Sequence, residues 1–365
     1  MDRKRRRGRW VLGLVGVGGL LGMGWRLFPR EPSLLGRATV IANTAPWHEG
    51  ERFRSDLGVH WLSESDILFC RFEGPNHEER VSYRRNVRTG RDEKLAAFTE
   101  ARNDFATEVV DDQRVSPDGR WFVCSDRWGE CLLAEVNGAH HYTYPSADSA
   151  NYRSLLWMPD GHHWLEGYVN GGSASRLILH DTEHPQSSVS IPIRSEREQE
   201  LFGSLEAAVS LQEGISIVAP DHDTGGLDVA PAGFDTPIVL TISWVSLDAS
   251  ARVRAEFRVN VPGQIGHYRL RVSPQGNRIA WQVTALREDV GRRWMHRYLP
   301  FVREHLYRRT QVWVSRSDGS GMREIGSIIE QPGEEKAGEL FLQWLPGGRR
   351  LSFEYKEVLY TVPAD

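Results

Sequence analysis

Cysteine is scarce in this 365-residue chain, which contains only three. Because three is an odd number, at least one thiol has no partner for a disulfide within the chain. Cys124 and Cys131 flank the short segment 125–130 and would face each other if the chain turned midway between them, which predicts a cross-strand disulfide in an oxidising compartment. The alternative is a pair of buried thiols. Cys70, in the apolar stretch ILFCRF, is expected to be a small core residue.

Recognisable catalytic motifs are also missing. The stretches DGSGM and GGSAS do not have the Gly-x-Ser-x-Gly spacing of a hydrolase nucleophile, and the sequence contains no glycosidase or zinc signature. The sequence therefore has to be interpreted through its fold before a function can be assigned to it.

Net positive charge is lacking outside the first thirty residues. Residues 1–30 have a net charge of +7, whereas the whole chain has −4, which leaves −11 for residues 31–365. An acidic domain repels phosphates instead of releasing their counterions. We therefore expect no nucleic-acid partner.

The N-terminus divides into a basic tail, residues 1–9, and the apolar run 10–28, in which Arg26 is the only charged residue. As a helix this run would be about 28 Å long, close to the hydrocarbon thickness of a bilayer. We expect a transmembrane signal-anchor helix; a cleaved signal peptide and a buried core helix are the alternatives. By the positive-inside rule, the tail stays in the cytoplasm and the rest is periplasmic or extracellular.

A turn motif recurs along the rest of the chain, most clearly as RVSPDG at 114–119 and RVSPQG at 271–276. Proline presets φ for the second turn position, and glycine takes the positive φ that lets the chain enter the next strand. Strand-rich units that repeat about every 40–50 residues are typical of propeller blades, and the longer intervals require loop insertions. Six copies, of which the fourth is degenerate, align on Ser63, Pro117, Pro159, Gln212, Pro274 and Pro346.

Each unit has a second hairpin, joined at Thr89-Gly90 in the first unit and at Asp318-Gly319 in the fifth, so that four strands fit each unit. The last unit has only three strands, whereas residues 38–43, ATVIAN, precede the first unit without a partner. We therefore predict an all-β, six-bladed propeller of four-stranded blades over 38–365, preceded by a linker at 29–37 and closed by this N-terminal strand. Five or seven blades are the alternatives.

The motifs SPDG, IAW, VWVSRSDGSG and REIG resemble the propeller repeats of the TolB family. The resemblance extends over about residues 59–363 as short motifs. It implies the propeller architecture and a role in protein–protein interaction. TolB itself is a soluble periplasmic protein with an additional N-terminal domain, and in this chain the apolar run stands in the place of that domain.

One acidic loop is a candidate for metal binding. The loop DHDTGGLD places Asp221, Asp223 and Asp228 around a Gly-Gly turn, where they can offer oxygen ligands to Ca²⁺. A solvated acidic turn is the alternative, and Ca²⁺ is the only cofactor that we consider. The histidine pairs at 140–141 and 162–163 lack the spacing of ligands on a helix, and they do not by themselves predict a metal site.

The segment 284–310 has a net charge of +4 within the acidic domain, and its apolar residues recur at four-residue spacing, which predicts a helical insertion. Arginine and aromatic residues are the types that carry interface hot spots. Packing on the propeller and contact with anionic lipid are the alternative roles. The candidate interface consists of Arg292, Arg293, Trp294, Arg297, Tyr298 and Phe301.

Together these features predict a membrane-anchored, extracytoplasmic propeller that binds an envelope protein, a peptide or another ligand as a scaffold. The alternative is an enzyme of the hydrolase or lyase type with its site in the central channel. Carboxylates or histidines converging there from different blades would favour the enzyme. The sequence gives no indication of the oligomeric state.

Overall fold

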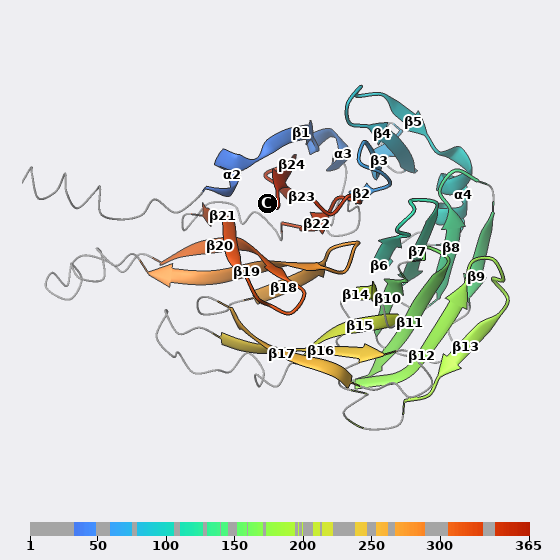
Figure 1. Ribbon diagram of the computed structural model, residues 1–365. Helices are drawn as coiled ribbons and strands as arrows, with labels where there is room; N and C mark the ends of the chain where they lie inside the picture. Colours follow the sequence, from blue (N-terminus) through green and yellow to red (C-terminus); the bar gives the residue numbers. More distant parts are fainter. Residues whose placement is uncertain are drawn as a thin grey trace, which may run out of the picture.

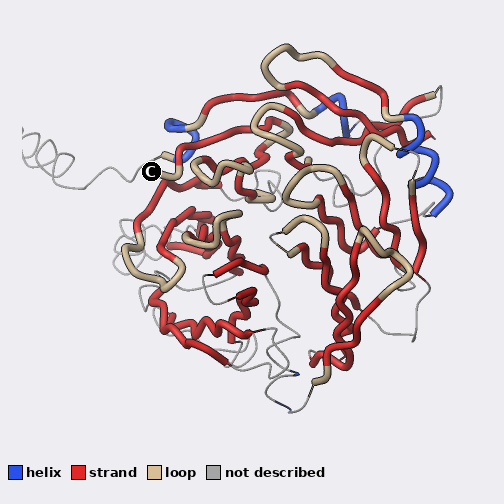
Figure 2. The backbone as a smooth tube through the Cα atoms, turned by 45° about the vertical axis from the view of Figure 1, so that its right-hand side comes forward, coloured by secondary structure: helices blue, strands red, loops and turns tan. Residues whose placement is uncertain are grey.

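The strands of the protein form six four-stranded antiparallel sheets arranged around a common centre, as Figures 1 and 2 show. The predicted all-β propeller architecture is confirmed, and each repeat unit found in the sequence corresponds to one sheet. The computed structural model describes residues 33–48, 59–74, 79–105, 110–126, 130–138, 140–144, 152–158, 160–170, 173–193, 207–211, 214–221, 238–246, 253–261, 267–288, 306–330 and 340–365.

The first three sheets follow the chain order without crossovers. Sheet 1 contains β2 (His60–Trp61), β3 (Asp66–Glu73), β4 (Glu79–Asn86) and β5 (Asp92–Lys94). Sheet 2 contains β6 (Val110–Val115), β7 (Trp121–Asp126), β8 (Cys131–Glu135) and β9 (His141–Tyr144). Sheet 3 contains β10 (Tyr152–Trp157), β11 (His163–Asn170), β12 (Ser173–Asp181) and β13 (Ser188–Ile191).

The sixth sheet differs from the others because it takes one strand from the beginning of the described chain. Sheet 4 contains β14 (Ala207–Leu211), β15 (Gly214–Asp221), β16 (Ile238–Ser246) and β17 (Val253–Val261). Sheet 5 contains β18 (His267–Val272), β19 (Arg278–Glu288), β20 (Leu306–Arg316) and β21 (Arg323–Glu330). Sheet 6 contains β22 (Gln343–Trp344), β23 (Arg350–Tyr355), β24 (Val358–Pro363) and β1 (Thr39–Asn43).

The ring closes as the sequence predicted. Strand β1 pairs antiparallel with β24, so that Thr39 lies opposite Thr361 and completes the last sheet (Figure 1). Side chains also join sheet 6 to sheet 1: Gln343 Nε2 donates to the Val59 carbonyl at 2.7 Å. The N-terminal strand thereby covers an edge that would otherwise present unpaired backbone groups.

The serine of the recurring turn has a role that the sequence did not reveal. Ser116 Oγ accepts the backbone N–H of Trp121 at 2.9 Å, and Ser273 Oγ accepts that of Arg278 at 3.2 Å. The glycine at the end of the turn takes positive φ as predicted, with +72° at Gly119. The turn is therefore held by a side-chain bond between its two strands as well as by its backbone.

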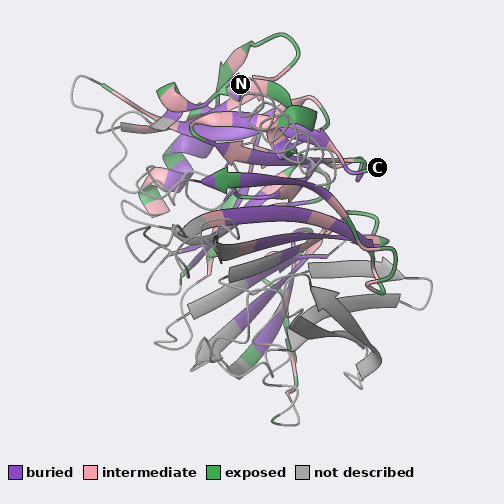
Figure 3. Ribbon diagram, turned by 90° about the vertical axis from the view of Figure 1, so that its left-hand side faces the viewer, coloured by how far each residue is buried: buried purple, intermediate pink, exposed green. Residues whose placement is uncertain are grey.

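Apolar side chains between neighbouring sheets form the core (Figure 3). Two tryptophans that precede the turns add polar links across these junctions. Trp157 Nε1 donates to the Arg114 carbonyl at 3.2 Å, and Trp344 Nε1 donates to the Arg271 carbonyl at 2.8 Å. A tryptophan at the equivalent position thus joins sheet 3 to sheet 2 and sheet 6 to sheet 5.

The helices whose bounds are described are short and peripheral, and they comprise α2 (Leu34–Arg37), α3 (Ala45–His48) and α4 (Ala96–Phe105). Buried Phe98 attaches α4 to the core between sheets 1 and 2. Within the described ranges, no helix has the length and apolar character needed to cross a membrane. The predicted tail at 1–9 and the predicted anchor at 10–28 lie outside these ranges.

The predicted disulfide between Cys124 and Cys131 is wrong. Neither cysteine forms a disulfide in the structure, and both are buried. The strand register pairs Cys131 with Ser125, and Cys124 with Leu132, so the two cysteines point to opposite faces of sheet 2. Cys124 packs in the core toward sheet 1, whereas Cys131 packs in the core toward sheet 3.

The predicted helical insertion at 284–310 is wrong at both of its ends. Strands β19 and β20 remain paired up to Glu288 opposite Leu306, so both ends of that segment are extended β-structure. Leu286, which the sequence placed on a helix, lies in β19 opposite Arg308. The remainder, residues 289–305, lies outside the described residues.

Candidate functional site

Two turns of sheet 3 lie side by side and bring polar side chains together. The turn after β10 and the turn after β12 are at the same end of the sheet because successive antiparallel strands reverse direction. Thr182 N–H donates to the His162 carbonyl at 2.9 Å, and His163 lies opposite Asp181 in the β11–β12 register. The sequences DGHH and DTEH therefore contribute to one surface.

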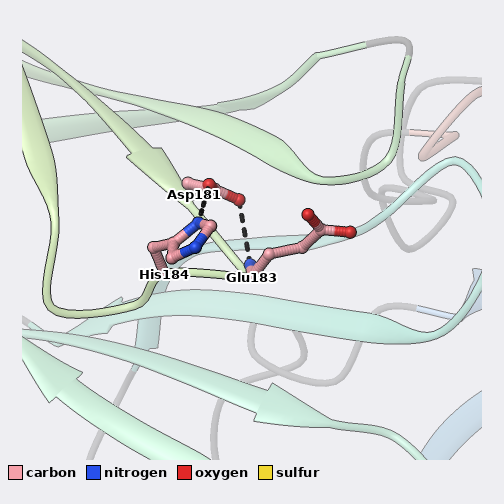
Figure 4. A group of neighbouring side chains, drawn as sticks. All are labelled: Asp181, Glu183 and His184. Carbon is pink, nitrogen blue, oxygen red and sulfur yellow. Dashed lines mark hydrogen bonds and ion pairs between the residues drawn. The ribbon is translucent and has the colours of Figure 1, made fainter.

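Asp181, Glu183 and His184 form the centre of this surface (Figure 4). His184 Nδ1 lies 2.9 Å from Asp181 Oδ2, and the Glu183 backbone N–H donates to Asp181 Oδ1 at 2.9 Å. One oxygen or nitrogen from each of the three side chains lies within 4.8 Å of the other two. Asp181 is held from two directions, whereas the other two side chains remain exposed to solvent.

The turn after β10 adds three more titratable groups. His163 Nδ1 lies 2.7 Å from Asp160 Oδ2, while Asp160 Oδ1 accepts the backbone N–H groups of both His162 and His163 at 2.9 Å. His162 Nδ1 lies 3.8 Å from Glu183 Oε1 and so links the two turns. Three imidazoles and three carboxylates are therefore gathered at one end of sheet 3.

The electrostatics of this group keep its aspartates ionised. Burial would raise the pKa of Asp181, but the hydrogen bond from His184 and the backbone N–H of Glu183 outweigh it and lower that pKa. In the same way, hydrogen bonds from His163 and His162 lower the pKa of Asp160 against the effect of burial. The hydrogen bond to Asp181 and its negative charge raise the pKa of His184. The site thus has fixed negative charge beside imidazole nitrogen.

A second polar group is buried between sheets 2 and 3. His180 Nε2 lies 2.8 Å from Glu166 Oε2, and Cys131 Sγ lies 3.6 Å from Glu166 Oε1. The His180 ring stacks on Trp164 with a centroid distance of 4.0 Å. These groups do come from different sheets, but His180 and Glu166 are only 3% and 1% exposed, so that no substrate reaches them.

Most site residues predicted from the sequence lie outside the described structure. The side chains of Asp221, Asp223 and Asp228 are not described, although Asp221 is placed at the end of β15. The candidate interface residues fall within 289–305, between β19 and β20, and are also outside it. Neither prediction is tested. The structure instead brings together a group that the sequence reading missed, with His162 and His163 as its only anticipated members.

A sequence signal for the missed group did exist. The second hairpin of each unit turns at the same end of the sheet as the first. DTEH at 181–184 could therefore have been placed beside DGHH at 160–163. Only the strand register, with His163 opposite Asp181, makes that placement specific.

Comparison with known proteins shows the fold and no closer relationship. No family model and no curated protein matches the chain. The WD40 repeats of RRP9 share 11% identity over 92% of this chain and 99% of theirs, with a TM-score of 0.48. An oligogalacturonate lyase in complex with manganese shares 10% identity over 90% of this chain and 89% of its own, with a TM-score of 0.42.

The tricorn protease is also similar, with 12% identity over 84% of this chain and a TM-score of 0.45, but the match spans only 29% of that protease. Enzymes and WD40 domains thus occur together among the similar propellers. At these identities the likeness concerns the fold alone. The resemblance to TolB stays at the level of turn motifs.

Proposed function

We propose that this chain is a membrane-anchored, extracytoplasmic propeller that acts as a binding scaffold for a protein or peptide of the cell envelope, as its TolB-like turn motifs imply. The observation that carries the proposal is the hairpin of β19 and β20. Its two strands pair over eleven positions, from Arg278 opposite Arg316 to Glu288 opposite Leu306, which is longer than any other ladder among the described strands.

Residues 289–305 connect the two strands of this hairpin along the chain. That segment contains Arg292, Arg293, Trp294, Arg297, Tyr298 and Phe301. Aromatic side chains bury a large area at protein interfaces. Tryptophan, tyrosine and arginine are the types most often found at interface hot spots. The long ladder supports a docking role because it is an extended hairpin whose two strands lead directly into this segment.

The attachment of the N-terminal segment supports the same arrangement. Leu34 is fully buried in the core between sheets 5 and 6, and Arg37 Nη1 donates to the Ile325 carbonyl at 2.9 Å. With an anchor ending at Phe28, residues 29–33 span at most roughly 18 Å. The outer edge formed by β1 and β21 is then held near the bilayer, and both loop-bearing ends of the ring stay open to partners.

Photo-crosslinking in the membrane of intact cells tests the docking role. A photoreactive amino acid is placed at Trp294 or Tyr298, with Val189 as the control because it is 61% exposed on the edge strand of sheet 3. We expect a discrete cross-linked protein from the first two positions and none from the control. Equal cross-linking from all three positions, or none from any, would overturn the docking role.

Thiol labelling tests the location separately. All three native cysteines are buried, so a Val189→Cys variant adds one reactive thiol to a low background. We expect a membrane-impermeant maleimide to label this variant in cells whose outer barriers have been opened but whose cytoplasmic membrane is intact. Labelling only after the cytoplasmic membrane is broken would show that the propeller is not exported.

A further inference from the structure

The turns of sheet 3 carry a set of side chains whose types and arrangement suit the binding of a metal ion. An acidic turn alone would attract hard cations weakly, but here imidazole and carboxylate groups alternate across two turns that contact each other. Imidazole nitrogen and carboxylate oxygen are both ligands of divalent first-row transition metals, and a site with three protein ligands leaves further positions for water.

We propose that Asp181, Glu183 and His184 bind a divalent transition-metal ion of the Zn²⁺ or Mn²⁺ class. Their ligand atoms already lie within 4.8 Å of one another. Two ligands that each lie about 2.0–2.2 Å from one ion are at most about 4.4 Å apart, so a separation near the 4.8 Å limit has to shorten when an ion binds. Small rotations of the exposed Glu183 and His184 side chains complete the approach, and the backbone does not have to move.

The surroundings hold the turn that carries these ligands. Ser187 N–H donates to the His184 carbonyl at 2.7 Å, and Thr182 N–H donates to the His162 carbonyl at 2.9 Å. The backbone of the site is therefore fixed at both ends, which lowers the entropy lost when an ion binds. His162, 3.8 Å from Glu183 through its Nδ1 atom, is placed to supply a fourth ligand after a side-chain rotation.

The chemistry of the set selects among cations. Imidazole nitrogen favours zinc, iron and nickel over Ca²⁺ and Mg²⁺, which prefer an all-oxygen shell, while the two carboxylates also suit manganese. The Cys131 thiol is buried, so the exposed site contains no thiolate, which disfavours soft ions such as Cu(I). The carboxylates of Asp181 and Glu183 supply oxygen ligands beside the imidazole nitrogen of His184.

Sheet 2 provides a matched control in the equivalent turn. His140 Nδ1 lies 3.1 Å from Glu135 Oε2, and their side chains are 74% and 24% exposed, compared with 72% and 24% for His184 and Asp181. This pair reproduces the His–carboxylate contact of sheet 3. Among the described residues, however, only the sheet 3 turn assembles three ligand side chains.

The test is a titration of the full chain, freed of metal by a chelator, with Zn²⁺ in a calorimeter and with Co²⁺ by visible absorption. We expect one ion per chain, and Co²⁺ bands of a site with nitrogen and oxygen ligands. The variants Asp181→Asn, Glu183→Gln and His184→Ala should each weaken Zn²⁺ binding by at least about tenfold. His140→Ala should bind Zn²⁺ as the unmodified chain does.

Binding should also weaken as the pH falls, because protons compete with the ion for His184. Circular dichroism of each variant separates loss of the site from loss of the fold, and Glu183→Gln is an exposed substitution that should leave the fold intact. Failure of the unmodified chain to bind Zn²⁺ or Co²⁺ would overturn the proposal. Unchanged binding in the three sheet 3 variants, or equal loss in His140→Ala, would overturn it as well.

Discussion

The Nε2 atom of His180 lies 2.8 Å from Oε2 of Glu166, and this pair is buried between sheets 2 and 3. A buried carboxylate is tolerated only when its charge and its hydrogen bonds are satisfied. Removal of one partner leaves the other desolvated and unpaired, which typically costs more than the intact pair contributed. The junction between these sheets therefore depends on both side chains.

We predict that Glu166→Ala lowers the free energy of unfolding by about 3 kcal/mol or more. The control is Glu135→Ala, which removes the partly exposed carboxylate beside the exposed His140 and should cost at most about 1 kcal/mol. Urea denaturation followed by tryptophan fluorescence measures both values. Similar losses for the two variants would contradict a special role for the buried pair.

A glycine of the recurring turn leads to the second prediction. Gly119 has a φ of +72°, and a Cβ atom there would lie 2.2 Å from the carbonyl oxygen of Leu62 in the neighbouring sheet. Gly119→Ala should therefore cost the conformational strain and a steric clash, together more than about 2 kcal/mol. Gly321 has a φ of +64° with no atom within 4 Å of such a Cβ.

Gly321→Ala isolates the conformational contribution and should cost only about 1–2 kcal/mol. Thermal unfolding of both variants gives the comparison. If the two melting temperatures fall equally, the turn of sheet 2 does not pack closely against sheet 1, and the steric contribution is absent.

The sequence predicts the repeating parts of this fold because their chemistry is local. Positive φ at Gly119 follows from the SPDG turn alone. Closure by residues 39–43 follows from counting strands, since one unit lacked a strand and one strand lacked a unit. Both inferences depend on residues that are close in sequence or on a simple count, and neither needs knowledge of side-chain packing.

Register is what the sequence could not supply. A symmetric turn between Cys124 and Cys131 would have paired the two thiols, whereas the actual register opposes Cys131 to Ser125. A shift of one residue moves every side chain of a strand to the other face, so a small error in a loop reverses the conclusion. The metal-binding group depends in the same way on the register that places His163 opposite Asp181.

The tryptophans between sheets lead to the third prediction. Trp344→Phe keeps most of the apolar contact but removes the donor that binds the Arg271 carbonyl at 2.8 Å. We expect a loss of about 1–2 kcal/mol in the free energy of unfolding, including the cost of the unpaired carbonyl. Trp157→Phe, which removes the bond to Arg114, should behave similarly.

Trp313 provides the contrast. Its Nε1 is shut off from solvent and has no hydrogen-bond partner among the described residues. Trp313→Phe should therefore cost less than the other two substitutions, because it removes a donor that is already unsatisfied. Denaturant titrations of the three variants under the same conditions decide the matter, and an equal or greater loss at Trp313 would show that packing, not hydrogen bonding, dominates.

His60 should make the stability of the propeller depend on pH. Burial, together with the positive charges of Arg102 and Arg114, lowers its pKa from 6.5 to about 3. Between these two values the unfolded chain binds a proton that the folded chain does not bind. The free energy of unfolding therefore falls as the pH decreases from 6.5 toward 3, by up to about 1.4 kcal/mol for each pH unit.

The variant His60→Gln cannot titrate and tests this directly. Carboxylates such as Asp66, whose pKa is lowered because hydrogen bonds from Ser63, Ser65 and Asn86 outweigh the effect of burial, contribute equally to both chains and cancel in the comparison. The unmodified chain should lose about 2 kcal/mol more than the variant between pH 6.5 and pH 4.5. Parallel pH profiles would mean that the folded chain also protonates His60 in this range, because the imidazole then has access to water.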